Sequence, residues 1–570
     1  MRHTEATIQS IRGIQRPLIV APPPSCVPTP FEVKGVVYTK RWVVELMLDL
    51  AGYCSEHNLV DTLAIEPAAG DGAFLGPMIE RLIDSCRKLE RPFSDCQKSL
   101  LAYELDDDSA QRARALAIDI LEARGVTHAL AESLASGWIR TADYLFEGGI
   151  AAADFVVGNP PYVRLEEIPE ETAALYRKAY PTMRGRADLY VGFFEAALRQ
   201  LRDGGVCAFI CADRWMRNQY GAALRDMVTE GYAVEIVIEM HNADAFREEV
   251  DAYPAITIIR RSIQTSVVLA TAGPQVEKIS HRTLSTELLT ADHSNPSSLE
   301  GLRTAVVDTW FKGVDPWPYR SPEQLALLRR LEEHFPVLET SARVGIGVAT
   351  GNDGVFISKD ADLVESSRLL KLALVSDICE GALKWSGYYL VDPWDSDGLV
   401  NLDRYPRLRA YFLKHEIALR KRHTAAKNIH GWYKTIDRVT HALTNKPKLY
   451  IADIKNVLDP VLDSGQTYPH HNLYFIHSDV WDLEVLGGLL MSALGQFFVE
   501  SYGVRMRGGY LRFQAQYLRR IRVPAPDTLS KAQLHELRTA FRKRDRDRAT
   551  HAALQAYGMD AHTLETALGH

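Results

Sequence analysis

The sequence predicts an α/β fold, with a doubly wound sheet in the N-terminal half and an α+β domain after it. Between about residues 31 and 262, short runs of β-branched residues alternate with longer helical runs, which is typical of a sheet with helices on both faces. From about residue 341 to 525 the alternation ends, and short glycine-punctuated strands are mixed with many aromatic and basic residues. A chain of 570 residues is long enough for two or three packed domains.

Seven strands and four of the intervening helices can be placed in the first domain, residues 31–262. The expected strands are 62–66, 100–104, 138–141, 155–158, 206–211, 233–239 and 255–260. The expected helices are 41–51, 75–88, 109–123 and 190–201.

The other segments are expected to be peripheral. Residues 1–30 end in the proline-rich APPPSCVPTP, which predicts a flexible N-terminal arm. We expect residues 263–340 to link the two domains and residues 526–570 to form a charged helical tail. In that tail, the basic run from Arg538 to Arg548 is interpreted as a solvated helix.

Composition excludes several classes of protein. The net charge of −7 argues against a protein that coats nucleic acid by bulk charge, although a basic face could be local. The seven cysteines are scattered without a CxxC pair, so we expect no disulfide framework and no metal site, as in a reducing cytosol. The first residues have no signal-like apolar core, and no run approaches 18 apolar residues, so we expect no membrane span.

The segment AIEPAAGDGAFL, residues 64–75, carries the pattern of a ligand-binding turn between a strand and a helix. Gly70 and Gly72, with Ala68 before them, allow a tight turn and close approach of a ligand to the backbone. Glu66 ends the strand, where open α/β sheets bind ligands. Its negative charge suits the cationic end of S-adenosylmethionine better than a phosphate, and the GKS or GKT of a phosphate loop is absent. An ordinary strand–helix turn is the alternative.

Two further acids follow the next strands. Glu104 ends its strand in AYELDDD, where a carboxylate can accept hydrogen bonds from ribose hydroxyls; its position in the strand favours it over the three aspartates that follow. Asp143, in TADYLF, could accept from the amine of the cofactor adenine, and Tyr144 could pack on that ring.

The strongest signal is ADFVVGNPPYVR, in which an apolar strand stops at Asn159-Pro160-Pro161-Tyr162. Two prolines cannot continue a sheet ladder, so they fix a rigid loop at the strand end. The Asn159 side-chain oxygen and the Pro160 carbonyl could bind both protons of an exocyclic amine and direct its lone pair at a methyl sulfonium. Tyr162 could stack on the base. Orientation of an in-line transfer would then be the main contribution of the protein.

In this order, and with GVVYTKRWVVELM before them, these motifs resemble the gamma class (Taq/Eco57I-like) of DNA adenine-N6 methyltransferases of type II restriction–modification systems. The resemblance covers nearly all of residues 31–525. It implies a class I, seven-stranded Rossmann-like methyltransferase domain, an α+β target-recognition domain, S-adenosylmethionine as cofactor, and double-stranded DNA as substrate. The target adenine must flip out of the duplex to reach such a site, at a cost of roughly a few kcal/mol.

The same resemblance implies further residue roles. Thr39 matches a threonine that contacts the methionine part of the cofactor, although Lys40 stands where many relatives have proline. Asn159 also contacts the cofactor, and Phe193 or Phe194 lies beside it. Phe246 corresponds to the aromatic that stacks on the flipped adenine opposite Tyr162; Tyr253 is the alternative, and either ring could simply be core.

The second domain contains basic residues that are candidates for DNA contact. Arginines are interleaved with Tyr510, Phe513 and Tyr517 near the end of the domain, and arginine suits both phosphate and guanine. The candidates there are Arg505, Arg507, Arg512, Arg519, Arg520 and Arg522. Lys446 and Lys448 are weaker candidates.

Three other interpretations remain. Enzymes that methylate a protein glutamine share the NPPY motif but are much shorter. A non-catalytic DNA-binding subunit would not need the intact acids and NPPY. A fused nuclease finds no room ahead of residue 31. We therefore expect a monomeric modification enzyme, cytoplasmic and nucleoid-associated, whose partner nuclease is encoded separately; an orphan or phage-defence role fits the same site.

Overall fold

The computed structural model describes residues 38–147, 152–248, 253–293, 299–308, 310–311, 313–317, 322–426, 430–503 and 510–568. The expected arm 1–30 and the candidates Arg505 and Arg507 lie outside these residues. The chain divides into two compact units, Met1–Pro322 and Glu323–His570, and each is described by itself.

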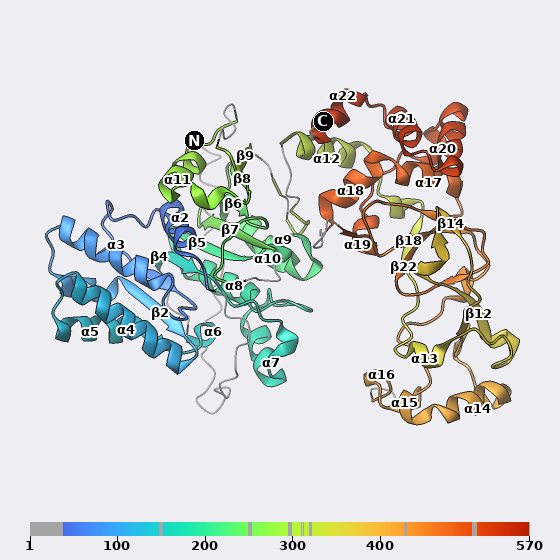
Figure 1. Cartoon of the computed structure of the whole chain (residues 1–570), viewed down its shortest axis with the longest axis horizontal. Coiled ribbons are helices and arrows are strands. Elements are labelled where there is room, and N and C mark those ends of the chain that lie inside the picture. The colour runs from blue at the N-terminus through green and yellow to red at the C-terminus, as the bar shows by residue number, and fades with distance from the viewer. Residues whose placement is uncertain are drawn as a thin grey trace, which may run out of the picture. The chain divides into compact units, whose positions relative to one another are not determined.

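The first unit is built on a nine-stranded sheet (Figure 1). Its strand order is β3-β2-β1-β4-β5-β7-β6-β8-β9. The strands are β1 (Ala64–Glu66), β2 (Leu100–Glu104), β3 (Ile139–Thr141), β4 (Ala153–Gly158), β5 (Leu201–Ala212), β6 (Ala233–Glu239), β7 (Pro254–Arg260), β8 (Val267–Ala272) and β9 (Leu302–Val307). Strands β1 to β5 are parallel, and β7 runs antiparallel between β5 and β6. The first seven strands are those that the sequence predicts, including the final hairpin.

Helices connect these strands. They are α2 (Arg41–Ala51), α3 (Leu75–Lys88), α4 (Asp107–Ala123), α5 (His128–Trp138), α6 (Tyr144–Glu147), α7 (Glu170–Ala179), α8 (Tyr190–Gln200), α9 (Arg214–Arg217), α10 (Ala222–Gly231) and α11 (His281–Leu289). From β1 the chain moves to β2, whereas from β4 it moves to β5 on the other side. Right-handed crossovers therefore place α3 and α8 on opposite faces. The crevice between β1 and β4, at their carboxyl ends, is where such a sheet binds ligands.

The expected linker 263–340 is wrong for most of its length. Strand β8 pairs with β6, β9 pairs with β8, and the boundary between the units falls only at residue 322. Helix α11 packs on α2, where His281 Nδ1 lies 2.8 Å from Asp49 Oδ2. These strands are short and separated by α11, so the seven-strand count is two too low.

The second unit contains helices and mostly antiparallel sheets, as an α+β domain does. One sheet has the order β10 (Arg343–Ile346), β22 (Leu473–His477), β18 (Lys448–Ala452) and β20 (Val461–Asp463). A second has the order β11 (Ile357–Ser358), β15 (Tyr389–Val391), β12 (Leu369–Ala373) and β21 (Tyr468–Pro469). Short strand pairs complete the unit: β13 (Ile378–Cys379) with β14 (Ala382–Leu383), β16 (Trp394–Asp395) with β17 (Gly398–Leu399), and β19 (Ile454–Lys455) with β23 (Leu511–Arg512).

The helices of this unit gather in two places (Figure 1). The short α13 (Asp353–Phe356), α14 (Pro406–Lys414), α15 (Glu416–Arg420) and α16 (His423–Ala426) lie together at one end of the unit. The others are α12 (Pro322–His334), α17 (Leu483–Met491), α18 (Ala493–Tyr502), α19 (Ala515–Leu518), α20 (Lys531–Lys543), α21 (Arg546–Ala556) and α22 (Ala561–Leu568). Most of these contribute to one apolar core.

The C-terminal tail is helical, as expected, but it is part of this core. Leu537, Ala540 and Phe541 of α20 are buried against α17. A side chain at Gly487 of α17 would meet the Phe541 ring at 2.4 Å, so the two helices pack in very close contact. The interpretation of this segment as a solvated helix is therefore wrong for its inner face.

Within the described part of the chain, no single helix is long and apolar enough to span a membrane. By length and composition alone, α17 and α18 would pass together as a bent pair. Both belong to the apolar core of the second unit.

Candidate active site

The turn after β1 is shaped by two glycines in left-handed conformations. Gly70 has φ +53°, and a Cβ on it would meet nothing within 4 Å, so a ligand can approach the backbone there. Gly72 has φ +90°, and a Cβ on it would lie 2.8 Å from Leu116 Cδ2 of α4. The amide of Ala69 donates to the Tyr103 carbonyl at 2.9 Å, which fixes the turn to β2. The turn is therefore packed against α4 at Gly72 and leaves space for a ligand at Gly70.

Glu66 stands at the end of β1 with its side chain buried. Burial, and after it the charge of Glu104, raise the pKa of Glu66 well above its ordinary value, while hydrogen bonds from the Phe74 and Leu75 amides act in the opposite direction. Its Oε2 atom is buried and has no hydrogen-bond partner among the residues that the structure describes. A cation beside this oxygen would stabilise the ionised form, so the site fits a positively charged ligand.

Glu104 ends β2 and faces the same turn. Its Oε2 accepts from the Gly70 amide at 2.7 Å, and its Oε1 accepts from the Asp106 amide at 2.9 Å. Each carboxylate oxygen can accept a second hydrogen bond, so ribose hydroxyls could still bind there. Asp106 instead caps α4 by accepting from the Ser109 amide, which separates its role from that of Glu104.

Asp143 follows β3 and is already hydrogen-bonded within the protein. It accepts from the Tyr176 hydroxyl at 2.5 Å and from the Leu145 amide at 2.9 Å, and burial raises the pKa of its carboxyl. Tyr176 of α7 also stacks on Phe146, with ring centroids 4.9 Å apart. No local motif marks Tyr176, so its contact with Asp143 could not be predicted from the sequence.

The two aromatics expected near the cofactor adenine lie together. Phe193 of α8 and Tyr144 have ring centroids 5.3 Å apart, and both are almost fully buried. The Tyr144 hydroxyl donates to Gln200 at 2.9 Å inside the core. Tyr144 therefore packs against Phe193 within the core. This position does not favour the expectation that Tyr144 packs on a ligand. Phe194 packs on Phe209 and Trp215 and is a core residue.

The Asn159-Pro160-Pro161-Tyr162 loop begins where β4 ends, beside β1. A Cβ on Gly158 would lie 3.1 Å from Pro67 and 3.9 Å from Glu66 Cγ, so this loop starts next to the buried acid. The Asn159 Nδ2 donates to Thr39 Oγ1 at 3.2 Å. With its nitrogen committed to Thr39, the group that Asn159 can offer to a substrate amine is its oxygen.

A third segment, around Phe246, lies beside Thr39. Thr39 forms a β-bridge with Phe246, the Lys40 amide donates to the Ala245 carbonyl at 2.9 Å, and the Arg247 amide donates to the Tyr38 carbonyl at 2.9 Å. Residues 39, 159 and 246, which are far apart in the sequence, therefore meet through hydrogen bonds.

The rings of Tyr162 and Phe246 face each other edge-on. Their centroids are 6.4 Å apart with an interplanar angle of 84°. A base held between two parallel rings needs roughly 7 Å between them, about twice the ordinary carbon–carbon contact distance. One ring must therefore rotate before a base can enter. The alternative Tyr253 packs on His241 at 4.9 Å, which favours Phe246.

The described basic candidates of the second unit form ion pairs or hydrogen bonds with other residues of the chain. Lys446 Nζ lies 2.9 Å from Asp479, and Arg512 Nη2 lies 2.6 Å from Asp453. Lys448 is buried and paired with Asp463 at 3.0 Å, so it is a core residue, and burial lowers its pKa. Arg520 lies 3.7 Å from Glu332, and Arg522 donates to the Phe335 carbonyl at 3.2 Å. Phe513 and Tyr517 are core, and only Tyr510 is exposed.

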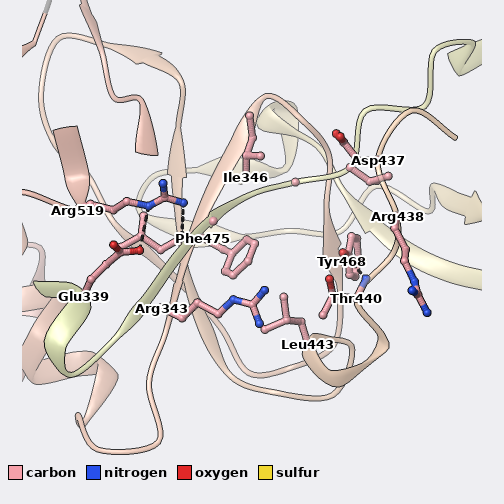
Figure 2. A pocket seen from close by; sticks show the side chains of 14 residues that line it. Glu339, Arg343, Ile346, Asp437, Arg438, Thr440, Leu443, Tyr468, Phe475 and Arg519 are labelled. Carbon is pink, nitrogen blue, oxygen red and sulfur yellow. Dashed lines mark hydrogen bonds and ion pairs between the residues drawn. The ribbon is translucent and has the colours of Figure 1, made fainter. Parts of the chain in front are cut away.

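A pocket of about 270 Å³ opens beside β10 in the second unit (Figure 2). Arg519 lies at its edge and is bonded to Glu339 at 2.9 Å and to the Val344 carbonyl at 3.1 Å. Arg343 also lines it, and the structure gives this side chain no ion pair or hydrogen bond to a described residue. Ile346 is half exposed at its rim. The pocket is lined mainly by polar and glycine residues, and the sequence analysis did not single out Arg343.

Comparison with known proteins identifies a matching family and several sequence relatives. The Eco57I restriction-modification methylase family matches residues 135–246, which include the NPPY loop and Phe246. The chain is 42% identical over 545 residues to the type II methyltransferase M.PaeR7I of Pseudomonas aeruginosa, covering 94% of each chain. It is 41% identical over 536 residues to M.XhoI of Xanthomonas vasicola, covering 92% of this chain and 97% of that one.

Among solved structures, the type IIL restriction-modification enzyme MmeI has a similar fold. The TM-score is 0.56 at 12% identity, over 93% of this chain and 73% of that one. Relatives at about 40% identity along almost the whole length establish the family. The chain belongs to the type II methyltransferases of restriction–modification systems.

Proposed function

We propose that this protein transfers a methyl group from S-adenosylmethionine to the N6 amine of an adenine in double-stranded DNA. The observation that carries the proposal is the Asn159 side chain, which is bonded to Thr39 beside the buried Glu66 and near the rings of Tyr162 and Phe246. An amide oxygen, an acid and two aromatic rings then surround one position.

The residues at the carboxyl ends of β1, β2 and β3 fit the cofactor. Glu66 offers a buried carboxyl oxygen to its cationic end, and Gly70 leaves space above the turn. Glu104 suits the ribose, and Asp143 and Phe193 are the candidates for contact with the adenine ring. When bound, S-adenosylmethionine supplies a methyl group on a positively charged sulfur.

The NPPY loop would act by orientation. The Asn159 oxygen and the Pro160 carbonyl can accept the two N–H groups of the amine, which directs its lone pair away from the ring system. Holding the reacting groups in line can supply a large part of a rate enhancement. The methylated nitrogen carries a positive charge and releases a proton readily, so no strong base is required at this position.

The target adenine must leave the helix to reach this loop. Loss of stacking and pairing costs roughly a few kcal/mol. Packing of the adenine between Tyr162 and Phe246 offsets part of this cost once one of the two rings has rotated. Burial raises the pKa of the Tyr162 hydroxyl, so this ring stays neutral across the physiological range.

The experiment is expression of the chain in a host that lacks adenine methylation, followed by sequencing of modified bases. We expect N6-methyladenine in one short sequence context, which would also identify the recognition sequence. Asn159→Ala should abolish methylation while the protein still folds and binds cofactor, whereas Asn58→Ala, at an exposed asparagine, should not. Full methylation by Asn159→Ala refutes the role of this residue, and methylation of protein glutamine without DNA modification refutes the substrate.

Protection of host DNA from a separately encoded nuclease is the biological role that we infer from this chemistry. Relatives are named for type II modification, which supports that role over an orphan one.

A further inference from the structure

One segment of the second unit is strongly basic. Residues 404–438 contain ten lysines and arginines but only two acids, in a protein whose net charge is −7. Its described residues include α14, α15, α16 and residues 430–438. A local basic face of this kind is the electrostatic footprint of a polyanion-binding surface.

Three cations on or beside these helices are exposed and unpaired among the described residues: Arg404 precedes α14, Lys414 ends α14 and Lys421 follows α15. The side chains of Arg404, Lys414 and Lys421 are exposed, and the structure gives them no ion pair or hydrogen bond to any residue that it describes. Cations on a solvated helix more often lie beside acids, which stabilise them. Exposed cations without such acids are available to bind an anionic partner.

The basic tail provides an internal comparison. It is also a basic run, but four of its five arginines have an acidic partner in the fold, and Arg546 donates to the Leu458 carbonyl at 3.0 Å. Arg538 binds Asp482, Arg542 binds Glu484, Arg544 binds Asp459 and Arg548 binds Glu536. Four arginines of the tail are therefore paired with acids, whereas Arg404, Lys414 and Lys421 receive no acidic partner among the described residues.

The basic helices are mounted rigidly. Arg422, between α15 and α16, donates to the carbonyls of Thr350, Trp432 and Lys434 at 2.8 to 3.0 Å. At the start of α14, the Arg407 and Leu408 amides donate to the Glu365 carboxylate at 2.8 and 3.0 Å. A fixed array of cations loses less entropy on binding than a flexible one.

The same contacts join these helices to the pocket beside β10. Arg422 holds Thr350, which follows β10, and the Ala349 amide donates to Asp437 Oδ2 at 2.9 Å. Asp437 and Arg438 line that pocket (Figure 2). The basic helices and the pocket wall thus form one hydrogen-bonded substructure.

We propose that the exposed cations of α14–α16 bind the phosphate backbone of the DNA duplex and position it on the second unit. This proposal rests on the proposed function, which makes DNA the substrate. It moves the phosphate contacts from Lys446 and Arg512, which the structure pairs with acids, to Arg404, Lys414 and Lys421. Phosphate contacts fix the position of a protein on DNA without reading sequence, so the effect does not depend on the recognition site.

The test is the salt dependence of binding to a short mixed-sequence duplex, measured by fluorescence anisotropy on the full chain. Each lost phosphate contact lowers the slope of log affinity against log salt by about 0.9. Lys414→Gln/Lys421→Gln should therefore lower the slope by about 1.8 and weaken binding at low salt by roughly tenfold or more. The control Lys446→Gln/Arg512→Gln removes the same charge from paired positions and should leave the slope unchanged. Unchanged cofactor binding and melting temperature show that the variants are folded.

A wild-type slope in Lys414→Gln/Lys421→Gln overturns the proposal, and so does an equal loss in the control variant. The proposal is also overturned if Lys414→Gln/Lys421→Gln loses binding to anionic lipid vesicles but keeps its affinity for DNA. If the wild-type protein methylates DNA but the salt slopes of the wild type and that variant do not differ, only the phosphate-binding proposal fails. The proposed function then stands. Wild-type protein that neither binds nor methylates DNA removes both.

Discussion

Replacement of Glu66 by glutamine tests whether the buried acid is coupled to the charge of the cofactor. In the free protein, burial and the charge of Glu104 raise the pKa of Glu66 well above the ordinary value of 4.5. Between these two pKa values the carboxyl keeps its proton. A cation bound beside Oε2 favours the ionised form, so binding must release that proton.

The sign and size of the effect follow from this linkage. Below the raised pKa of Glu66, release of one proton makes the affinity for S-adenosylmethionine rise with pH, by up to about tenfold, or roughly 1.4 kcal/mol, per pH unit. Above that pKa the dependence ends. Glu66→Gln keeps the shape of the side chain but has no charge, so it should bind more weakly and lose this dependence.

The assay is calorimetric titration of S-adenosylmethionine in two buffers with different ionisation enthalpies. The difference in heat gives the number of protons released, which should approach one for the wild type and zero for Glu66→Gln. Glu56→Gln, at an exposed acid paired with Lys88, is the matched control. If the wild type releases no proton, or if Glu66→Gln releases as many, the coupling between Glu66 and the cofactor is refuted.

Three further predictions concern stacking, the turn and the second core. Tyr162→Ala should lower methyl transfer by at least tenfold with cofactor affinity unchanged, whereas Tyr162→Phe should retain most activity; equal rates in an assay with radiolabelled cofactor would rule out stacking. Gly72→Ala should destabilise the protein by about 1–3 kcal/mol through backbone strain and a clash with Leu116. Gly70→Ala has the strain without a clash, so it should destabilise the protein less and also weaken cofactor binding; thermal melting and calorimetry separate the two effects. Asp463→Asn should destabilise the protein by about 3–5 kcal/mol, because it leaves the Lys448 ammonium buried without its charge partner; urea denaturation with little change would show that this pair is not needed.

The sequence predicts elements well where a long regular pattern is complete within one segment. The expected bounds of α2 and α3 agree with the structure, and both have a continuous buried face. Strand β8 is not predicted because it comes after the hairpin at which the expected sheet ended. Its membership of the sheet depends on pairing with β6, which no local pattern encodes.

The candidate site divides in the same way. Glu66, Glu104 and Asn159 could be identified because each follows a buried strand, and strand ends of a parallel sheet meet at one edge. Tyr176 could not, because it lies on an ordinary amphipathic helix and reaches Asp143 only through the fold. The edge-on arrangement of Tyr162 and Phe246 was equally invisible, since it depends on side-chain rotation.

The DNA-binding candidates show why a charge pattern is a weaker guide than a strand end. A basic run predicts an anion-binding face only if the fold places no acids beside it. The acids that pair with Arg512, Lys446 and Arg538 lie 59, 33 and 56 residues away in the chain, so no local window could count them. Lys414 and Lys421 belong to the same class of residue in the sequence but receive no such partner among the described residues. Pairing in the fold, rather than the density of basic residues, therefore decides which cations can bind phosphate, and the salt slopes of the two double variants measure that difference directly.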